Sequence, residues 1–263
     1  MRPKVLGVIP ARYKSTRFPG KPLALIAGKP MIQWVYERAK RTRLLDEVFV
    51  ATDDRRIEKV VRGFGGKVVM TSDEHPSGTD RAWEAVSILE CGMRNADFKK
   101  PKSQIQKVEI VVNIQGDEPL IQPKAIDDAV RALTKDETCD ISTLAAPAGP
   151  EALLDPDVVK TVCDRSGFAL YFSRGTIPYP REGAGGRVLQ HIGLYAYRRE
   201  ALQRLSRMAP SRLEKIEKLE QLRALENGLK IKVITISSGW PSVDRPEDVK
   251  EVERILAKRY SRA

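Results

Sequence analysis

The sequence predicts an α/β protein with a mixed, mostly parallel sheet and helices on both faces. Two observations lead to this class. In the first half of the chain, short apolar runs with strand character alternate with longer helical patterns, and this alternation is typical of parallel sheets. From about residue 140 the pattern becomes richer in strands, which predicts a second, smaller lobe.

The first half begins with a buried strand at Val5–Ile9 and continues as three strand–helix repeats. Asp53 or Asp54 is the expected N-cap of the second helix. The segment from Cys91 to Lys107 is polar and is expected to be a surface excursion. The later strands are expected at 47–52, 67–70 and 108–120, the last of them ending in two carboxylates, and the helices at 29–43, 53–65 and 79–90.

The second half is expected to hold strands at 140–147, 158–164, 168–174, 190–197 and 230–237, and a last helix at 246–260. Residues 212–228 have the period of one amphipathic helix that ends at Gly228. Its inward face is expected to carry Leu213, Ile216, Leu219 and Leu222.

Composition bounds the class of protein. The 263 residues suit one domain with a main core and a smaller lobe, and the apolar fraction of 41% suffices for a globular core. The chain shows no membrane-length apolar run and no signal peptide, so we expect a cytoplasmic protein without a membrane partner. The net charge of +11 would permit nucleic-acid binding, but the excess of cations is spread along the chain. We therefore expect no nucleic-acid partner and keep a basic nucleic-acid-binding protein as the alternative from another class.

The loop after the first strand is rich in cations. In VIPARYKSTRFPGKPL (residues 8–23), Arg12, Lys14, Arg17 and Lys21 fall within ten residues. A solvated basic loop is one interpretation. The other is an anion cradle, because open α/β sheets bind ligands at the carboxyl ends of their strands and a polyphosphate needs several cations and N–H groups.

Carboxylates follow two other strands. Asp117 and Glu118 end the run at 108–120, and Asp244 follows the final strand. A helix cap would explain Asp244 alone, but Mg²⁺ bound to a nucleotide needs one or two protein carboxylates. The sequence lacks both the P-loop and the Gly-x-Gly-x-x-Gly pattern. A cation-rich loop facing carboxylates therefore favours transfer of a nucleotidyl group with Mg²⁺.

Eight motifs occur in the order seen in the bacterial 3-deoxy-manno-octulosonate cytidylyltransferase (CMP-Kdo synthetase) family, which the chain resembles from about residue 5 to 255. They are IPARYKSTRFPGKPL, HPSGTDR, NIQGDEP, YFSR, IPYPR, QHIGLYAYR, EKLEQLR and VDRPED. The resemblance implies a Rossmann-like nucleotidyltransferase fold in a single domain, 1–263. Its nucleotide-binding core would take about 1–140 and 225–263, and a sugar-binding and dimerisation lobe about 141–224.

The resemblance also implies an activity. CTP and 3-deoxy-manno-octulosonate (Kdo) would give CMP-Kdo and pyrophosphate with Mg²⁺, in a homodimer that activates Kdo for lipopolysaccharide synthesis. Arg12, Arg17 and Lys21 would bind the triphosphate. The cytosine and ribose would lie against Ala11, Ser77, Gly78 and Thr79, the metal ligands would be Asp117 and Asp244, and the sugar would contact Gln115, Arg174, His191, Tyr195, Glu220 and Gln221. Arg12, Lys21, Asp117 and Asp244 would be the catalytic residues.

Several of these residues have simpler interpretations. His191 could be a core histidine, Tyr195 could pack at a dimer interface, and Glu220 could lie on a solvated helix face. Arg174 could pair with a nearby acid such as Glu182.

The sequence also departs from the family pattern, at Pro76, Asp80 and Arg245 and in the short, glycine-rich loop 181–189. The rival substrate is the 8-amino analogue of Kdo or another acidic sugar. CMP-sialate synthetases and hexose-1-phosphate enzymes have other opening motifs.

Overall fold

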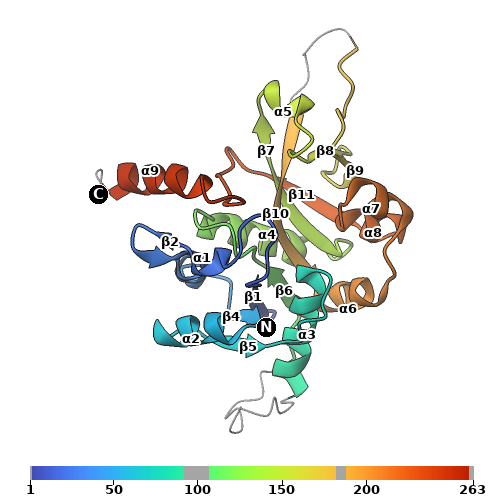
Figure 1. The fold of residues 1–263 in the computed structure, drawn as a ribbon. Helices are drawn as coiled ribbons and strands as arrows, with labels where there is room; N and C mark the ends of the chain where they lie inside the picture. The colour runs from blue at the N-terminus through green and yellow to red at the C-terminus, as the bar shows by residue number, and fades with distance from the viewer. Residues whose placement is uncertain (1, 92–106, 182–187, 261–263) are drawn as a thin grey trace. The chain divides into compact units, whose positions relative to one another are not determined.

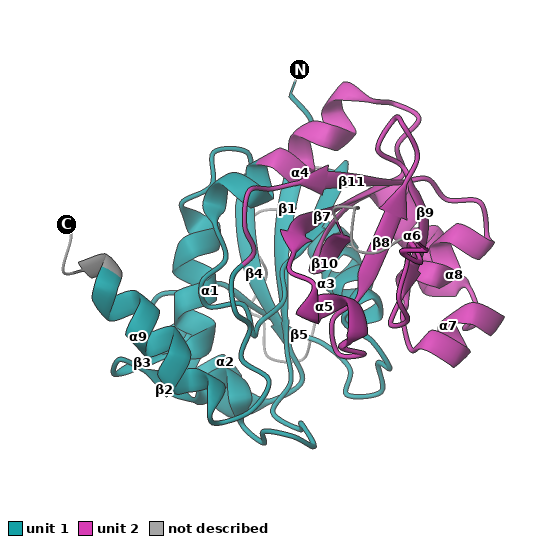
Figure 2. Cartoon of the chain, turned by 90° about the horizontal axis from the view of Figure 1, so that it is seen from above, with its two compact units in different colours: residues 1–127, 240–263 teal, residues 128–239 magenta. Residues whose placement is uncertain are grey.

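A computed structural model describes residues 2–91, 107–181 and 188–260. The polar segment 92–106 and the stretch 182–187, which includes Glu182, lie outside the described residues. The chain divides into two compact units (Figure 2). Unit 1 comprises residues 1–127 and 240–263, and unit 2 comprises residues 128–239.

Among the described residues of unit 1, four strands pair in parallel. β1 (Val5–Ala11) pairs with β4 (Glu47–Thr52) and β6 (Ile110–Asn113), and β4 also pairs with β5 (Val68–Met70). The apolar residues of β1 are buried, as the continuous apolar run predicts for a strand covered on both faces. All four strands point the same way, so the segments that follow them leave from one edge of the sheet.

The α-helices that lie wholly within the described part of unit 1 are α1 (Met31–Lys40), α2 (Arg55–Gly63), α3 (Gly78–Cys91) and α9 (Asp248–Tyr260). Figure 2 shows α1 and α2 on one side of the unit 1 strands and α3 on the other. Helix α1 buries Met31, Trp34, Val35 and Ala39, the face predicted from its period. Asp54 is the N-cap of α2, where its side chain accepts a hydrogen bond from the Arg56 N–H at 2.8 Å.

The chain between β1 and α1 forms small elements that the sequence analysis did not predict. They are the 3₁₀ helix η1 (Lys21–Leu23) and the hairpin of β2 (Leu25–Ile26) and β3 (Lys29–Pro30). The hairpin turn places Ala27 and Gly28 at φ of 49° and 77°, both in the left-handed region. Ile26 of this hairpin belongs to a core cluster of buried side chains: Ile26, Met31, Trp34, Leu120, Val243, Val252 and Leu256.

Unit 2 is built on antiparallel and parallel pairs. β7 (Ile141–Ala148) pairs in parallel with β11 (Ile231–Thr235) and antiparallel with β10 (Val188–Arg198), and β8 (Lys160–Cys163) pairs antiparallel with β10 and with β9 (Ala169–Ser173). The register of β10 shifts between Ile192 and Tyr195. Its helices are α5 (Glu151–Leu154), α6 (Arg199–Arg207), α7 (Arg212–Glu217) and α8 (Gln221–Glu226) (Figure 1). Helix α4 (Pro123–Lys135) crosses the boundary of the units, which lies between Asp127 and Asp128.

The prediction of one amphipathic helix over 212–228 is wrong. The segment forms two short helices, α7 and α8, because Lys218 takes a left-handed conformation with φ of 55° and ends α7. The break removes Ile216 from the predicted inward face and leaves it 66% exposed. The predicted stop at Gly228 is confirmed by its φ of 75°.

The predicted α/β class, with mostly parallel strands and flanking helices, is confirmed. Among the residues that the structure describes, no helix is long and apolar enough to span a membrane.

Candidate active site

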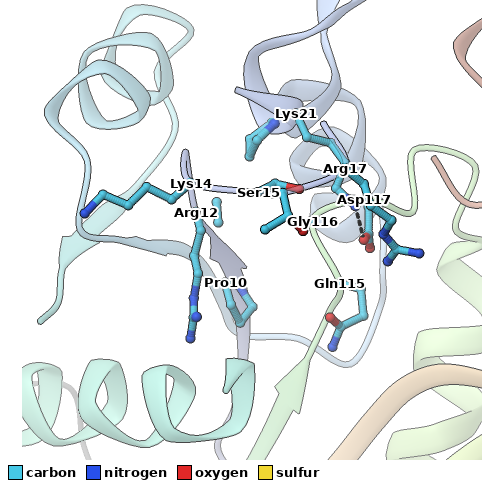
Figure 3. Close-up of a pocket in the computed structure, with 12 residues that line it drawn as sticks. Pro10, Arg12, Lys14, Ser15, Arg17, Lys21, Gln115, Gly116 and Asp117 are labelled. Carbon is cyan, nitrogen blue, oxygen red and sulfur yellow. Dashed lines mark hydrogen bonds and ion pairs between the residues drawn. The ribbon is translucent and has the colours of Figure 1, made fainter. Parts of the chain in front are cut away.

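The cation-rich loop opens into a pocket of about 390 Å³ at the carboxyl end of β1 (Figure 3). The walls come from the end of β1, the loop that follows it and the loop that follows β6. The lining residues are Pro10, Ala11, Arg12, Lys14, Ser15, Thr16, Arg17, Lys21, Pro22, Gln115, Gly116 and Asp117. The predicted triphosphate cations therefore line one pocket, together with one of the predicted carboxylates.

Local geometry explains how the basic loop returns on itself. The Gly20 N–H donates to the Tyr13 carbonyl at 2.8 Å, with Gly20 at φ of 72°, where a side chain would be strained. The Tyr13 ring adjoins Gly20 and also contacts the Arg56 guanidinium, whose carbon lies 3.3 Å from the ring centroid. These contacts close the loop around the segment that carries Lys14 and Arg17.

Two carboxylates converge on Lys21. Its Nζ lies 2.6 Å from Asp117 Oδ2 and 3.4 Å from Asp244 Oδ1, so these two oxygens are within about 6 Å of each other. Arg17 Nη2 lies 3.0 Å from the same Asp244 oxygen. The cations of the basic loop and two carboxylates that lie 96 or more positions later in the sequence thus form one charge cluster.

The backbone fixes the segments that carry the carboxylates. The Val243 N–H donates to the Asp117 carbonyl at 3.0 Å. Asp248, the first residue of α9, accepts from the Asp244 N–H at 2.8 Å and so fixes the backbone at Asp244, whose own carboxylate contacts Arg17 and Lys21. A Cβ at Gly116 would lie 2.9 Å from the Pro10 carbonyl oxygen, so the loop approaches β1 this closely because residue 116 is glycine.

The predicted base- and ribose-binding residues surround the start of α3 and the end of β1. Gly78 is the first residue of α3 and adjoins Pro10, and Thr79 is buried. Arg12 points to this side, because its Nη2 donates to the His75 carbonyl at 2.5 Å. Ser77 Oγ accepts from the Asp80 N–H at 3.1 Å and donates to Asp80 Oδ2 at 2.7 Å, so the Asp80 side chain, one of the departures from the family pattern, supports the turn.

The sequence analysis assigned no role to a buried ion pair beside this segment. Arg81 is fully buried, and its Nη1 lies 3.0 Å from Asp53 Oδ1 and 2.6 Å from Thr71 Oγ1. Burial lowers the pKa of Arg81, and the Asp53 carboxylate opposes that shift. Arg81 could have been singled out from the sequence because it lies in the motif HPSGTDR. Its partner Asp53 was considered only as a helix cap.

Glu118 is the second residue without an assigned role. Its carboxylate accepts a hydrogen bond from Trp240 Nε1 at 2.5 Å. Burial, followed by the neighbouring Asp117 carboxylate, raises the pKa of Glu118 to about 8. Its place next to Asp117 was visible in the sequence, but its partner Trp240 was not.

Gln115 belongs to unit 1, where its Nε2 donates to Asn113 Oδ1 at 3.3 Å. The other predicted sugar-binding residues, Arg174, His191, Tyr195, Glu220 and Gln221, belong to unit 2.

His191 lies between the rings of Phe172 and Tyr195, with centroids 5.1 Å and 5.4 Å away. Thr143 Oγ1 lies 2.8 Å from the Leu194 carbonyl oxygen and 2.9 Å from His191 Nε2. Because the carbonyl only accepts, the hydroxyl donates to it, and we assign a proton on Nε2 that is donated to the hydroxyl oxygen. Burial lowers the pKa of His191 to about 3, so the imidazole is neutral near pH 7.

Arg174 is held by backbone groups. Its Nε donates to the Glu217 carbonyl at 3.0 Å and its Nη1 to the Pro156 carbonyl at 2.8 Å, while its N–H donates to the Glu217 carboxylate. Glu220 Oε1 lies 3.9 Å from Arg223 Nη2, and Gln221 is buried at the start of α8. Burial raises the pKa of Tyr195, and the nearby Glu220 carboxylate adds to that shift.

This arrangement defines a class of protein. Several cations at the carboxyl end of a first parallel strand can bind a polyphosphate, and two carboxylates beside them can share a divalent cation with that polyphosphate. Among the described residues no group of three or more His, Cys, Asp or Glu side chains could hold a metal. A metal at this site would therefore take further ligands from a bound nucleotide, as in a nucleotidyltransferase.

Comparison with known proteins gives the family. A cytidylyltransferase family profile matches residues 6–231, and the chain belongs to this family of nucleotidyltransferases. A 3-deoxy-manno-octulosonate cytidylyltransferase of Syntrophobacter fumaroxidans is 49% identical over 260 residues, which are 97% of this chain and 98% of the relative. An 8-amino-3,8-dideoxy-manno-octulosonate cytidylyltransferase of Shewanella pealeana is also 49% identical, over 251 residues, 95% of this chain and 97% of the relative.

A solved structure has the same fold over nearly the whole chain. The structure of a CMP:2-keto-3-deoxy-manno-octonic acid synthetase complexed with CTP matches with a TM-score of 0.88 and 41% identity, covering 97% of this chain and 99% of that one. The resemblance inferred from the motifs is confirmed, and so is the assignment as an enzyme that transfers nucleotidyl groups. Family membership favours the enzyme over the nucleic-acid-binding alternative.

Proposed function

We propose that this protein is a cytidylyltransferase that couples CTP to 3-deoxy-manno-octulosonate and releases pyrophosphate. The observation that carries the proposal is the full-length match, at 49% identity, to a relative of that name. The pocket supports it independently, because its cations suit a triphosphate and its carboxylate suits a metal–nucleotide complex.

The triphosphate would bind to Arg12, Arg17 and Lys21. In the sequence the three cations follow β1 within ten residues, and in the fold they line one pocket (Figure 3). The base and ribose would lie toward Ala11 and the first turn of α3, at Ser77, Gly78 and Thr79. This side is where Arg12 makes its hydrogen bond to His75, which supports its placement between phosphates and base.

Asp117 and Asp244 fit a magnesium ion. Both carboxylates already contact one cationic group, the Lys21 ammonium, so their oxygens converge on a position where a positive charge is stabilised. Mg²⁺ prefers such oxygen ligands and commonly takes one or two carboxylates in addition to phosphates. When bound, the ion would polarise the phosphoryl group and offset its negative charge.

The sugar would be bound by Gln115, Arg174, His191, Tyr195, Glu220 and Gln221. A planar guanidinium pairs well with a carboxylate, so Arg174 would bind the carboxylate of the sugar. The neutral imidazole of His191 carries its proton on Nε2, so Nδ1 would accept a hydrogen bond from a sugar hydroxyl. His191 would therefore recognise a hydroxyl and not a charge.

In the reaction, the anomeric hydroxyl oxygen would bond to the α-phosphorus, the bond to the bridging oxygen would break, and pyrophosphate would leave with that electron pair. The hydroxyl proton would be released to water. The triphosphate of CTP and the carboxylate sugar are both anions and repel each other. The chain therefore contributes chiefly the positioning of the two substrates and positive charge that offsets the repulsion. Arg12, Arg17 and Lys21 would neutralise the departing pyrophosphate, and no covalent intermediate with the enzyme is required.

A second sugar has a specific observation in its favour. The relative named for the 8-amino sugar is as similar to this chain, at 49% identity, as the first relative named for Kdo. The test measures pyrophosphate release from CTP and Mg²⁺ with Kdo, its 8-amino analogue, sialic acid or a hexose 1-phosphate. We expect release with Kdo. Release with the 8-amino analogue alone would keep the reaction and change the sugar, and no release with any acceptor would contradict the proposal.

We also propose that the protein is a homodimer that works in the cytoplasm. Large apolar side chains of unit 2 are exposed and would be covered by a second copy; they are Leu154, Leu170, Tyr179 and Ile216. Sedimentation equilibrium at micromolar concentration measures the mass directly. A monomer under these conditions would contradict the homodimer.

A further inference from the structure

Two hydrogen bonds join the chain segments that carry Asp117 and Asp244. Trp240 Nε1 donates to Glu118 Oε2 at 2.5 Å, and the Val243 N–H donates to the Asp117 carbonyl at 3.0 Å. Glu118 follows Asp117 directly, and Val243 precedes Asp244 directly. The two bonds therefore act immediately beside the two carboxylates.

Both joined segments also pack in the hydrophobic core of unit 1. Val243 is fully buried in the core cluster of Ile26, Met31, Trp34, Leu120, Val243, Val252 and Leu256, and the Trp240 ring packs against the same cluster. Leu120, two residues after Glu118, also belongs to it. Both segments thus pack in one core, and the hydrogen bond from the Trp240 indole to Glu118 joins them directly.

Core packing alone does not explain a glutamate at position 118. A carboxyl group at a partly buried position beside Asp117 costs free energy unless a hydrogen bond offsets it, and an apolar side chain would avoid that cost. The bond from Trp240 is directional, so it specifies where the returning chain lies relative to the loop after β6. Van der Waals contact alone would specify that position less well.

We infer that Trp240 and Glu118 are a pair of positioning residues that sets the distance between the Asp117 and Asp244 carboxylates. The inference rests on the proposed role of these carboxylates in holding a divalent cation with CTP. Neither Trp240 nor Glu118 is among the described residues that line the pocket, and we therefore assign them a role through the two aspartates.

Trp240→Phe tests the inference, because it keeps an aromatic ring against the core and removes the N–H donor. The matched control is Trp34→Phe. Trp34 lies in the same cluster, and its Nε1 donates to the Ile26 carbonyl at 2.9 Å, a bond that holds neither aspartate segment. Glu118→Gln is the conservative variant, since its amide oxygen still accepts from Trp240.

The measurement is calorimetric CTP binding by the full chain, with Mn²⁺ and again with EDTA. The readout is the factor by which Mn²⁺ tightens CTP binding. In Trp240→Phe this factor should fall about tenfold, the effect of losing one partly buried hydrogen bond, while CTP binding in EDTA stays unchanged. Trp34→Phe and Glu118→Gln should keep the factor within about threefold of the unaltered chain, and thermal unfolding should shift no more in Trp240→Phe than in Trp34→Phe.

Asp117→Asn separates this inference from the proposed function. If Asp117→Asn abolishes the Mn²⁺ effect but Trp240→Phe leaves it intact, the positioning role is wrong and the metal site stands. An equal loss in both tryptophan variants would also overturn the inference, because it would reflect general loosening of the core. If the unaltered chain shows no more Mn²⁺ effect than Asp117→Asn, the proposed metal site and the inference both fail.

Discussion

Replacing Lys21 by methionine tests two proposals together: that Lys21 binds the triphosphate, and that it belongs to the charge cluster with Asp117 and Asp244. Its side chain is 15% exposed and contacts Asp117 at 2.6 Å and Asp244 at 3.4 Å. A hydrogen bond to a charged group contributes about 1.5–3 kcal/mol, and the departing pyrophosphate would need this cation most. A loss of about 3 kcal/mol in the transition state corresponds to a roughly 150-fold lower kcat/KM. Methionine keeps an unbranched side chain that is one heavy atom shorter, and it removes the ammonium group with its charge and its N–H donors.

The assay is pyrophosphate release at saturating Mg²⁺, with Lys29→Met as the matched control. Lys29 also pairs with a carboxylate, Glu37, at 2.7 Å, but it does not line the pocket. Such partly exposed pairs contribute at most about 1 kcal/mol to stability, so Lys29→Met should keep kcat/KM within about twofold. The reasoning is refuted if Lys21→Met stays within threefold of the unaltered enzyme, or if Lys29→Met falls as far.

Three further predictions follow from the site. Asp117→Asn should lose most activity and keep its circular dichroism spectrum; normal turnover with Mg²⁺ would show that the metal assignment is wrong. Gly116→Ala places a Cβ 2.9 Å from the Pro10 carbonyl oxygen and should weaken CTP binding at least tenfold, whereas Gly63→Ala, where a Cβ meets nothing within 4 Å, should not. His191 has a pKa lowered by burial to about 3 from 6.5, so below pH 6.5 only the unfolded chain takes up its proton. Stability should therefore fall by about 2 kcal/mol between pH 6.5 and 5, and urea unfolding should show a smaller fall in His191→Gln; an equal fall in both would contradict the shifted pKa.

The strands and the first helices could be predicted from the sequence because they depend on local pattern. The continuous apolar run of β1 and the helical period of α1 have one consistent interpretation each. The prediction of one helix over 212–228 was wrong because it depended on apolar period alone. Its apolar period continues through Lys218, but the backbone there turns left-handed, and period alone does not report a backbone angle.

The site was predictable where a cluster lies within a short segment. Arg12, Arg17 and Lys21 stand close together in the sequence, so their meeting in one pocket needed no knowledge of the fold. The partners of Glu118 and Arg81 could not be predicted in this way. Trp240 is 122 residues from Glu118, and Asp53 was visible only as a helix cap, so their pairing depends on how the segments pack.

The central claim is that the cytidylyl group of CTP moves to the acidic sugar. The most direct test supplies CTP labelled with ³²P at the α-phosphate, together with Kdo and Mg²⁺, and separates the products by anion-exchange chromatography. The account predicts that the label appears in a sugar nucleotide in an amount equal to the pyrophosphate released. Label that appears only in free CMP, or stays in CTP, would contradict it.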